Sequence, residues 1–182
     1  MKMNAFKKLI LPMVAVVMFF SSCKDDDPVA PTLYDELGGT AMVADPNNAG
    51  SQIEKGRLGI RSVVDSTIFI IAGDSRLTKF FPVLLSEVGA GNLSGFSALS
   101  KNLTDFISIG AGATSYTYTG DSMKDAHDPA KNPRMAEKAA NADMDAFIDD
   151  VVKGAKKVGV PDAQIAKVGA VLESLRADIV QK

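Results

Sequence analysis

Two apolar stripes at helical spacing near the C-terminus constrain the fold more than any other feature of the sequence. Gly159 ends the first stripe, and Pro161 follows where the first position of a second helix is expected. Apolar residues that recur every three or four positions predict helices that bury one face. The stripes consist of Met144, Phe147, Ile148, Val151, Val152, Ala155 and Val158, and of Ile165, Val168, Leu172, Leu175 and Ile179. We therefore expect two packed core helices in this part of the chain.

The stretch 58–81 is also strongly apolar, but its pattern fits two structures. Ile60, Val64 and Ile68 would share one face of a helix. The segment 66–71, however, is rich in β-branched residues and would also suit a buried strand. The pattern alone leaves helix and strand open.

A capped turn and a polar segment precede this stretch. Thr32 has the side chain of a helix N-cap, and the glycine pair 38–39 is suited to ending the short helix that follows. Residues 40–57 are rich in Asn, Gly, Pro and Ser and have weak periodicity, so we expect a surface insertion that is partly helical. The run 45–50 has only a faint likeness to a calcium loop. We reject it because Gly56 stands where a bidentate glutamate is needed.

The N-terminus has the layout of a bacterial lipoprotein signal. Basic residues at positions 2, 7 and 8 precede an apolar run at 9–20, which is too short to span a bilayer as a helix. The sequence Phe20-Ser21-Ser22-Cys23 resembles a lipobox, although phenylalanine replaces the usual leucine. We expect residues 1–22 to be a signal peptide and Cys23 to be lipidated, because several acyl chains give a stable membrane anchor. An ordinary secretory signal that ends near a cysteine is the alternative.

Residues 23–31 form a short polar segment after this signal. Aspartates at 25–27 and prolines at 28 and 31 keep such a segment solvated and extended, as expected of a tether. The predicted location is therefore the bacterial cell envelope, with a lipid anchor in the outer membrane and the domain facing the periplasm or the cell surface.

Charge and residue inventory exclude several classes of function. Without residues 1–22 the chain keeps 17 basic and 22 acidic residues, a net charge of −5, which argues against a nucleic-acid partner. Cys23 is the only cysteine and His127 the only histidine, which excludes an intramolecular disulfide and a multi-histidine zinc or copper site. A Ser-His-Asp hydrolase remains formally open. Of the common metal centres, a haem held by one axial histidine fits this inventory best.

The lone histidine ends the stretch 118–127, Tyr-Thr-Gly-Asp-Ser-Met-Lys-Asp-Ala-His. A single histidine is usually a surface or structural residue. This stretch, however, resembles the segment around the proximal haem ligand of group I truncated haemoglobins. Three other blocks also resemble the family: 33–39 (Leu-Tyr-Asp-Glu-Leu-Gly-Gly), the Phe-Phe pair 80–81 and the Gly-Val-Pro junction 159–161. Together with 118–127, they stand in the same order along the chain as in the family. The resemblance implies an all-α fold, a globin-like two-over-two helical sandwich with insertions, over residues 32–182.

Three segments have no clear counterpart in this family: 40–57, 82–96 and 128–140. We expect them to be insertions. The same comparison favours helix over strand for residues 66–71, because it aligns them with a family helix that leads to the Phe-Phe pair.

The resemblance also implies a site for one haem b. His127 would be the proximal iron ligand. Separately from the resemblance, Asp125 and Asp128 are close to His127 in the sequence, and a carboxylate is one group that can fix an imidazole tautomer. The family's distal tyrosine position falls on Ile68, and Asn102 would stand where a second hydrogen-bond donor is common. Losing one donor costs a bound ligand on the order of 1–3 kcal/mol, so tight oxygen storage is not expected. The residues implied to contact haem are His127, Ile68, Phe80, Phe81, Asn102, Tyr118, Met123, Met144 and Phe147.

The implied function is the binding or turnover of a diatomic ligand, oxygen or nitric oxide, with an unidentified electron donor as a further partner. The sixth iron position would be open, or taken by water, Lys101 or the ligand. Haem capture or sensing at the envelope is one alternative. Another is a globin-derived interaction or adhesion module without haem, which the missing distal tyrosine and the insertions suggest. Fold resemblance does not fix function, and whether the protein is an enzyme or a binding protein stays open.

Overall fold

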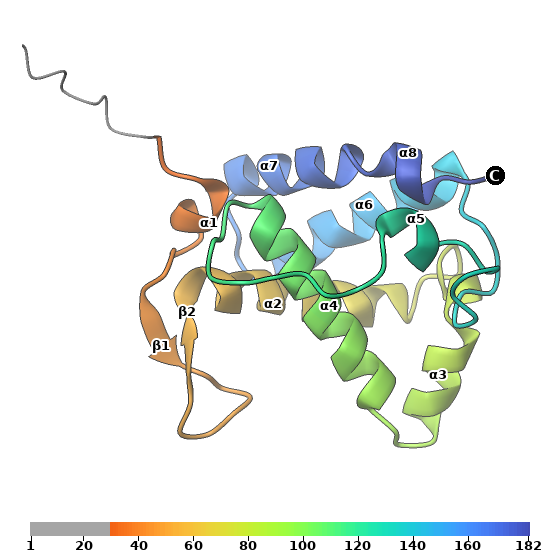
Figure 1. The fold of residues 1–182 in the computed structure, drawn as a ribbon, viewed down its shortest axis with the longest axis horizontal. Coiled ribbons are helices and arrows are strands. Elements are labelled where there is room, and N and C mark those ends of the chain that lie inside the picture. Colours follow the sequence, from red (N-terminus) through yellow and green to blue (C-terminus); the bar gives the residue numbers. More distant parts are fainter. Residues whose placement is uncertain (1–29) are drawn as a thin grey trace, which may run out of the picture. The chain divides into compact units, whose positions relative to one another are not determined.

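Two pairs of long helices form the core of the structure, a computed structural model that describes residues 30–182 (Figure 1). Helix α2 (Lys55–Ile71) packs against α4 (Ser94–Gly110), and α6 (Asn141–Lys157) packs against α7 (Asp162–Glu173). Helix α2 also lies along α6, and α4 contacts α7, so the two pairs stack as two layers. The prediction of an all-α, two-over-two arrangement is confirmed.

The other described elements are short. They are α1 (Leu33–Glu36), β1 (Met42–Ala44), β2 (Gln52–Glu54), the 3-10 helix η1 (Thr78–Phe80), α3 (Pro82–Gly89), α5 (Met123–Ala126) and α8 (Arg176–Ile179). The predicted signal peptide, the lipidation site Cys23 and the tether up to residue 29 lie outside the described residues. None of the described helices has the length and apolarity needed to cross a membrane.

The ambiguous stretch 66–71 is helical, as the end of α2. Val64 and Ile68 are buried, whereas the side chain of Phe69 is 67% exposed. The hydroxyl of Thr67 donates to the carbonyl oxygen of Val63 at 2.8 Å, which satisfies a polar group in the buried face. Burial at three- and four-residue spacing therefore overrides the strand preference of the β-branched side chains.

Helices α2 and α6 cross closely at Gly154. A side-chain carbon at this glycine would lie 3.0 Å from the backbone nitrogen of Thr67, which is too close for an unstrained contact. The lack of a side chain thus lets the two helix backbones approach each other. This crossing fixes α6, whose Met144 and Phe147 face the cavity described below.

The segment 40–57 contains a β-hairpin, which the sequence analysis did not predict, and its last three residues form the first turn of α2, the helical part of the segment. Strands β1 and β2 pair antiparallel, with Val43 opposite Ile53. The carboxylate of Asp45, in the turn between them, pairs with Arg61 at 2.7 Å. Three-residue strands give too little alternation to be recognised in the sequence.

Helix α1 begins at the predicted N-cap. The Thr32 hydroxyl accepts the amide of Asp35 at 3.1 Å, and the Asp35 carboxylate accepts the amide of Thr32 at 2.9 Å. The buried Tyr34 hydroxyl then donates to the Glu54 carboxylate at 2.6 Å. This hydrogen bond joins α1 to the end of the hairpin.

The predicted C-terminal helix is broken into α7 and α8. The amide of Leu175 donates to the carbonyl of Leu172 at 3.0 Å, a tighter turn than an α-helix has. The Arg176 guanidinium, just after the break, holds Glu173 and Asp145 at 2.6 and 2.7 Å. The apolar stripe continues through the break, which is why the spacing alone predicted one helix.

Candidate functional site

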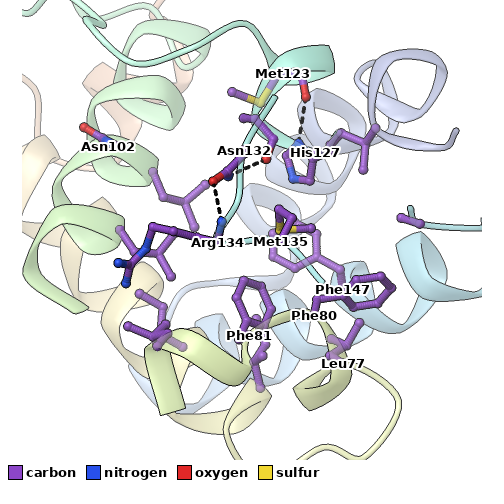
Figure 2. A pocket seen from close by; sticks show the side chains of 18 of the residues that line it. Leu77, Phe80, Phe81, Asn102, Met123, His127, Asn132, Arg134, Met135 and Phe147 are labelled. Carbon is purple, nitrogen blue, oxygen red and sulfur yellow. Dashed lines mark hydrogen bonds between the residues drawn. The ribbon is translucent and has the colours of Figure 1, made fainter. Parts of the chain in front are cut away.

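A largely apolar cavity of about 320 Å³ lies between α2, α3, α4, α5, α6 and the segment 128–140 (Figure 2). Its volume falls in the usual range of small-molecule sites, roughly 300–1,000 Å³. All nine residues that the family resemblance implied to contact haem line it: Ile68, Phe80, Phe81, Asn102, Tyr118, Met123, His127, Met144 and Phe147. The structure therefore brings together residues from five separate parts of the chain.

Aromatic side chains form the wall opposite the histidine. Figure 2 shows Phe80, Phe81 and Phe147 on one side of the cavity and His127 on the other. Phe80 is held by η1 and is only 3% exposed. Rings on a rigid helical frame provide the flat, water-excluding surface that a large apolar cofactor needs.

His127 directly follows α5 and is oriented by the backbone. Its Nδ1 atom lies 2.7 Å from the carbonyl oxygen of Met123, the first residue of that helix. A carbonyl oxygen only accepts hydrogen bonds, so Nδ1 carries the proton and Nε2 keeps a free lone pair. Burial lowers the pKa of His127, although the Met123 carbonyl acts in the opposite direction. The imidazole is therefore held in the neutral form that ligates metals.

Two carboxylates proposed to orient the imidazole do not do so. Asp125 bonds to Ser122, whose hydroxyl caps α5 by accepting the Asp125 amide at 3.1 Å. Asp128 accepts the amide of Ala130 at 3.0 Å in the turn that follows. The sequence prediction was wrong because proximity in sequence did not reveal that a backbone carbonyl takes this role.

Tyr118 is a wall of the cavity, and its hydroxyl is committed to its own loop. The hydroxyl donates to the carbonyl of Asp121 at 2.8 Å. The ring meets Phe106 of α4 edge-on, with the ring centres 5.3 Å apart. Burial, and then the Asp121 carboxylate, raise the pKa of Tyr118, so the phenol stays protonated.

The α2 and α4 sides of the cavity offer few hydrogen-bond donors. Ile68 is 6% exposed and lines the cavity with its aliphatic side chain. Asn102 lies at the α4 edge of the cavity, apart from the aromatic residues (Figure 2). Lys101, proposed as a sixth iron ligand, is not among the cavity residues and pairs with Asp105 at 2.7 Å. Of the options given for the sixth iron position, Lys101 thus has no place in the cavity wall of this structure, and its exposed side chain forms an ion pair one helical turn along α4.

The segment 128–140 contributes cavity residues that sequence reasoning missed. Asn132, Arg134 and Met135 all line the cavity. The amide nitrogen of Asn132 donates to the carbonyl of Ala126 at 2.8 Å, and its oxygen accepts the amide of Arg134 at 3.0 Å. The segment lacks periodicity and any motif, so only its closeness to His127 in the sequence could have pointed to it.

These residues fit a haem bound through one histidine. The free Nε2 lone pair of His127 is one axial donor, and the cavity walls are flat, aromatic and aliphatic. Arg134 adds a cation at the polar edge. A donor set of one neutral imidazole in an apolar cavity suits haem iron better than a zinc site, which needs several protein ligands.

Comparison with known proteins supports this fold. No family model matches the sequence, and no curated protein matches it significantly. Among solved structures, the truncated haemoglobin of Tetrahymena pyriformis in its Fe(III) form is similar, with a TM-score of 0.57 and 22% sequence identity. The match covers 84% of this chain and 100% of that one. Single-residue variants of the same haemoglobin match equally well. The described part of this chain therefore has the fold of the truncated haemoglobins.

Proposed function

We propose that the protein binds one haem b in this cavity, with Nε2 of His127 as the axial ligand. The observation that carries the proposal is the position of His127: a neutral imidazole, with Nδ1 committed to Met123, in the wall of an apolar cavity. Bound haem would supply an iron centre for binding or redox chemistry of oxygen or nitric oxide. The similarity to truncated haemoglobins supports the same cofactor.

The chain's own residues would set the properties of this site. The Met123 carbonyl holds the imidazole tautomer, and the cap at Ser122 holds the helix that carries the carbonyl. Ile68 and the phenylalanine pair exclude water but donate no hydrogen bond to a ligand. Absence of one donor weakens ligand binding by on the order of 1–3 kcal/mol. We therefore propose ligand exchange or turnover, with an unidentified electron donor, rather than tight oxygen storage.

The proposed location is the cell envelope, through a lipid on Cys23. Support comes from the sequence of residues 1–31. Expression of the full chain in a Gram-negative host that processes lipoproteins, with a labelled fatty acid, tests it. We expect the label in the membrane fraction, and loss of both label and membrane association in Cys23→Ala. Protein that carries no labelled fatty acid and stays in the soluble fraction would contradict the lipid anchor. Residues 1–22 would then be an ordinary secretory signal.

Haemin titration tests the proposed cofactor. The full chain in detergent is compared with His127→Gly, with a detergent blank for free haemin. We expect a sharp Soret band that saturates at one haem per chain, loss of that band in the variant, and its return when imidazole is added. Imidazole rescue would show that the lost group is the ligand rather than the fold. A broad spectrum of free haemin for both proteins would contradict haem binding. The remaining interpretation would be an interaction module without haem.

A further inference from the structure

An ion pair lies at the edge of the cavity, between the segment 128–140 and α3. The Arg134 guanidinium holds the Glu87 carboxylate with two bonds, Nη1 to Oε1 at 2.9 Å and Nη2 to Oε2 at 2.6 Å. Figure 2 shows the Arg134 side chain extending away from His127. Among the described residues that line the cavity, Arg134 is the only lysine or arginine. Arg134 is thus the one lysine or arginine in the described cavity wall, and its guanidinium is paired with the Glu87 carboxylate.

Gly95, in the first turn of α4, makes room for this pair. A side-chain carbon there would overlap both the Glu87 carboxylate and the Arg134 guanidinium. Gly95 lines the cavity as well. Arg134 and Gly95 thus both line the cavity, whereas Glu87 meets the guanidinium beside Gly95 and is not itself a lining residue.

The arginine is tied to the element that carries His127. Asn132 bonds to the carbonyl of Ala126, next to the histidine, and to the amide of Arg134. A ligand that contacts both His127 and Arg134 would therefore bind to one hydrogen-bonded segment, residues 126–134. Glu87 belongs to a different element, α3.

We infer that Arg134 is the receptor for a carboxylate of the cavity's ligand, and that Glu87 is an internal stand-in which that carboxylate displaces. The inference rests on the proposed function, since haem is a flat apolar molecule with carboxylates on one edge. A guanidinium matches a carboxylate with two parallel bonds, and such charge-assisted bonds are stronger than neutral ones. Exchange of one carboxylate for another keeps the arginine paired throughout.

The energetics suit such an exchange. The side chains of Arg134 and Glu87 are 47% and 24% exposed, so solvent screens their attraction. Glu87 would compete with a ligand carboxylate for the same guanidinium. Arg134 should thus favour carboxylated ligands, and loss of the Glu87 charge should strengthen their binding.

The test uses iron-free protoporphyrin and its dimethyl ester, because neither needs an iron ligand. Binding to the full chain is followed by fluorescence, and the readout is the ratio of the ester and acid dissociation constants. We expect the acid to bind about tenfold more tightly than the ester, since the ester cannot form a charge-assisted bidentate pair. Arg134→Gln should bring this ratio close to one, and Glu87→Gln should increase it severalfold.

Matched variants separate this effect from damage to the fold. Arg61→Gln removes a similar two-bond ion pair, with Asp45, outside the cavity. It should leave the ester-to-acid ratio unchanged. An equal ratio in the wild type and in Arg134→Gln, with haemin still bound, would overturn the inference and leave the proposed function intact. Failure of the wild type to bind haemin or either porphyrin would overturn both.

Discussion

The Nδ1 atom of His127 lies 2.7 Å from the carbonyl oxygen of Met123, four residues earlier. This one contact selects the tautomer, aims the ring and leaves Nε2 as the donor atom. It needs no acidic side chain, so the histidine keeps its ligand role although Asp125 and Asp128 are engaged elsewhere.

Stability should depend on His127 as the pH falls. Burial holds the pKa of His127 below its ordinary value of about 6.5. The unfolded chain therefore takes up a proton at a higher pH than the folded chain, and stability is lost as the pH drops from about 7 toward the lowered pKa. The slope from one proton is at most about 1.4 kcal/mol per pH unit. Urea unfolding at pH 7.5 and 5.5 measures it, and His127→Gln should show a smaller loss. An equal loss in both proteins would contradict the burial of the imidazole.

A hydroxyl at position 68 should slow ligand release. Ile68→Tyr places a donor in the apolar α2 wall, and we expect oxygen to dissociate from the haem-loaded protein roughly tenfold more slowly. Stopped-flow displacement by carbon monoxide measures the rate. Ile68→Phe has similar bulk without the hydroxyl and should not slow release. Equal rates for the two variants would show that the side chain does not reach the ligand.

The crossing of α2 and α6 should not tolerate a methyl group. Gly154→Ala would press a carbon against the Thr67 backbone, and we expect a loss of about 1–3 kcal/mol in the free energy of unfolding. A side-chain carbon at Gly169, in α7, would have no atom within 4 Å apart from its chain neighbours and the backbone of its own helix. Gly169→Ala should therefore be neutral or stabilising by up to about 1 kcal/mol. Denaturant titrations compare the two; similar effects would argue against the close crossing.

The bond between Tyr34 and Glu54 should contribute to stability because both groups are buried. Tyr34→Phe removes the donor at 2.6 Å and leaves a carboxylate unsatisfied, at a cost of about 1–3 kcal/mol. Burial, followed by the bond to Glu54, raises the pKa of Tyr34, so this phenol should not titrate before unfolding. Thermal unfolding of Tyr34→Phe, beside Tyr118→Phe with its exposed hydroxyl bond, measures the difference. A smaller loss for Tyr34→Phe than for Tyr118→Phe would show that the buried bond does not hold α1 to the hairpin.

The sequence predicted the helical core because apolar residues recur every three or four positions within the core helices. The stripe that contains Met144 and the one that contains Leu172 identify α6 and α7 without reference to the rest of the chain. For α2 the periodicity and the β-branched composition disagreed. The family resemblance favoured a helix, and packing on both neighbouring helices is the physical reason for it. Likewise, His127 could be singled out because it is the only imidazole.

The polar edge of the site could not be predicted in this way. Arg134 and Glu87 are 47 positions apart and belong to segments without a shared pattern. Their pairing depends on how α3 folds back along α4 and on the space left at Gly95. A contact set by tertiary packing leaves no local signal in the sequence.

The most direct test of the haem ligand is nuclear magnetic resonance of the histidine ring nitrogens, since the chain has a single histidine. Without haem at neutral pH, we predict a neutral ring with the proton on Nδ1. On binding ferrous, carbon monoxide-saturated haem, the Nε2 resonance should shift strongly while Nδ1 keeps its proton. A ring protonated on Nε2, or nitrogen resonances that do not change when haem binds, would contradict the assignment of His127 as the axial ligand.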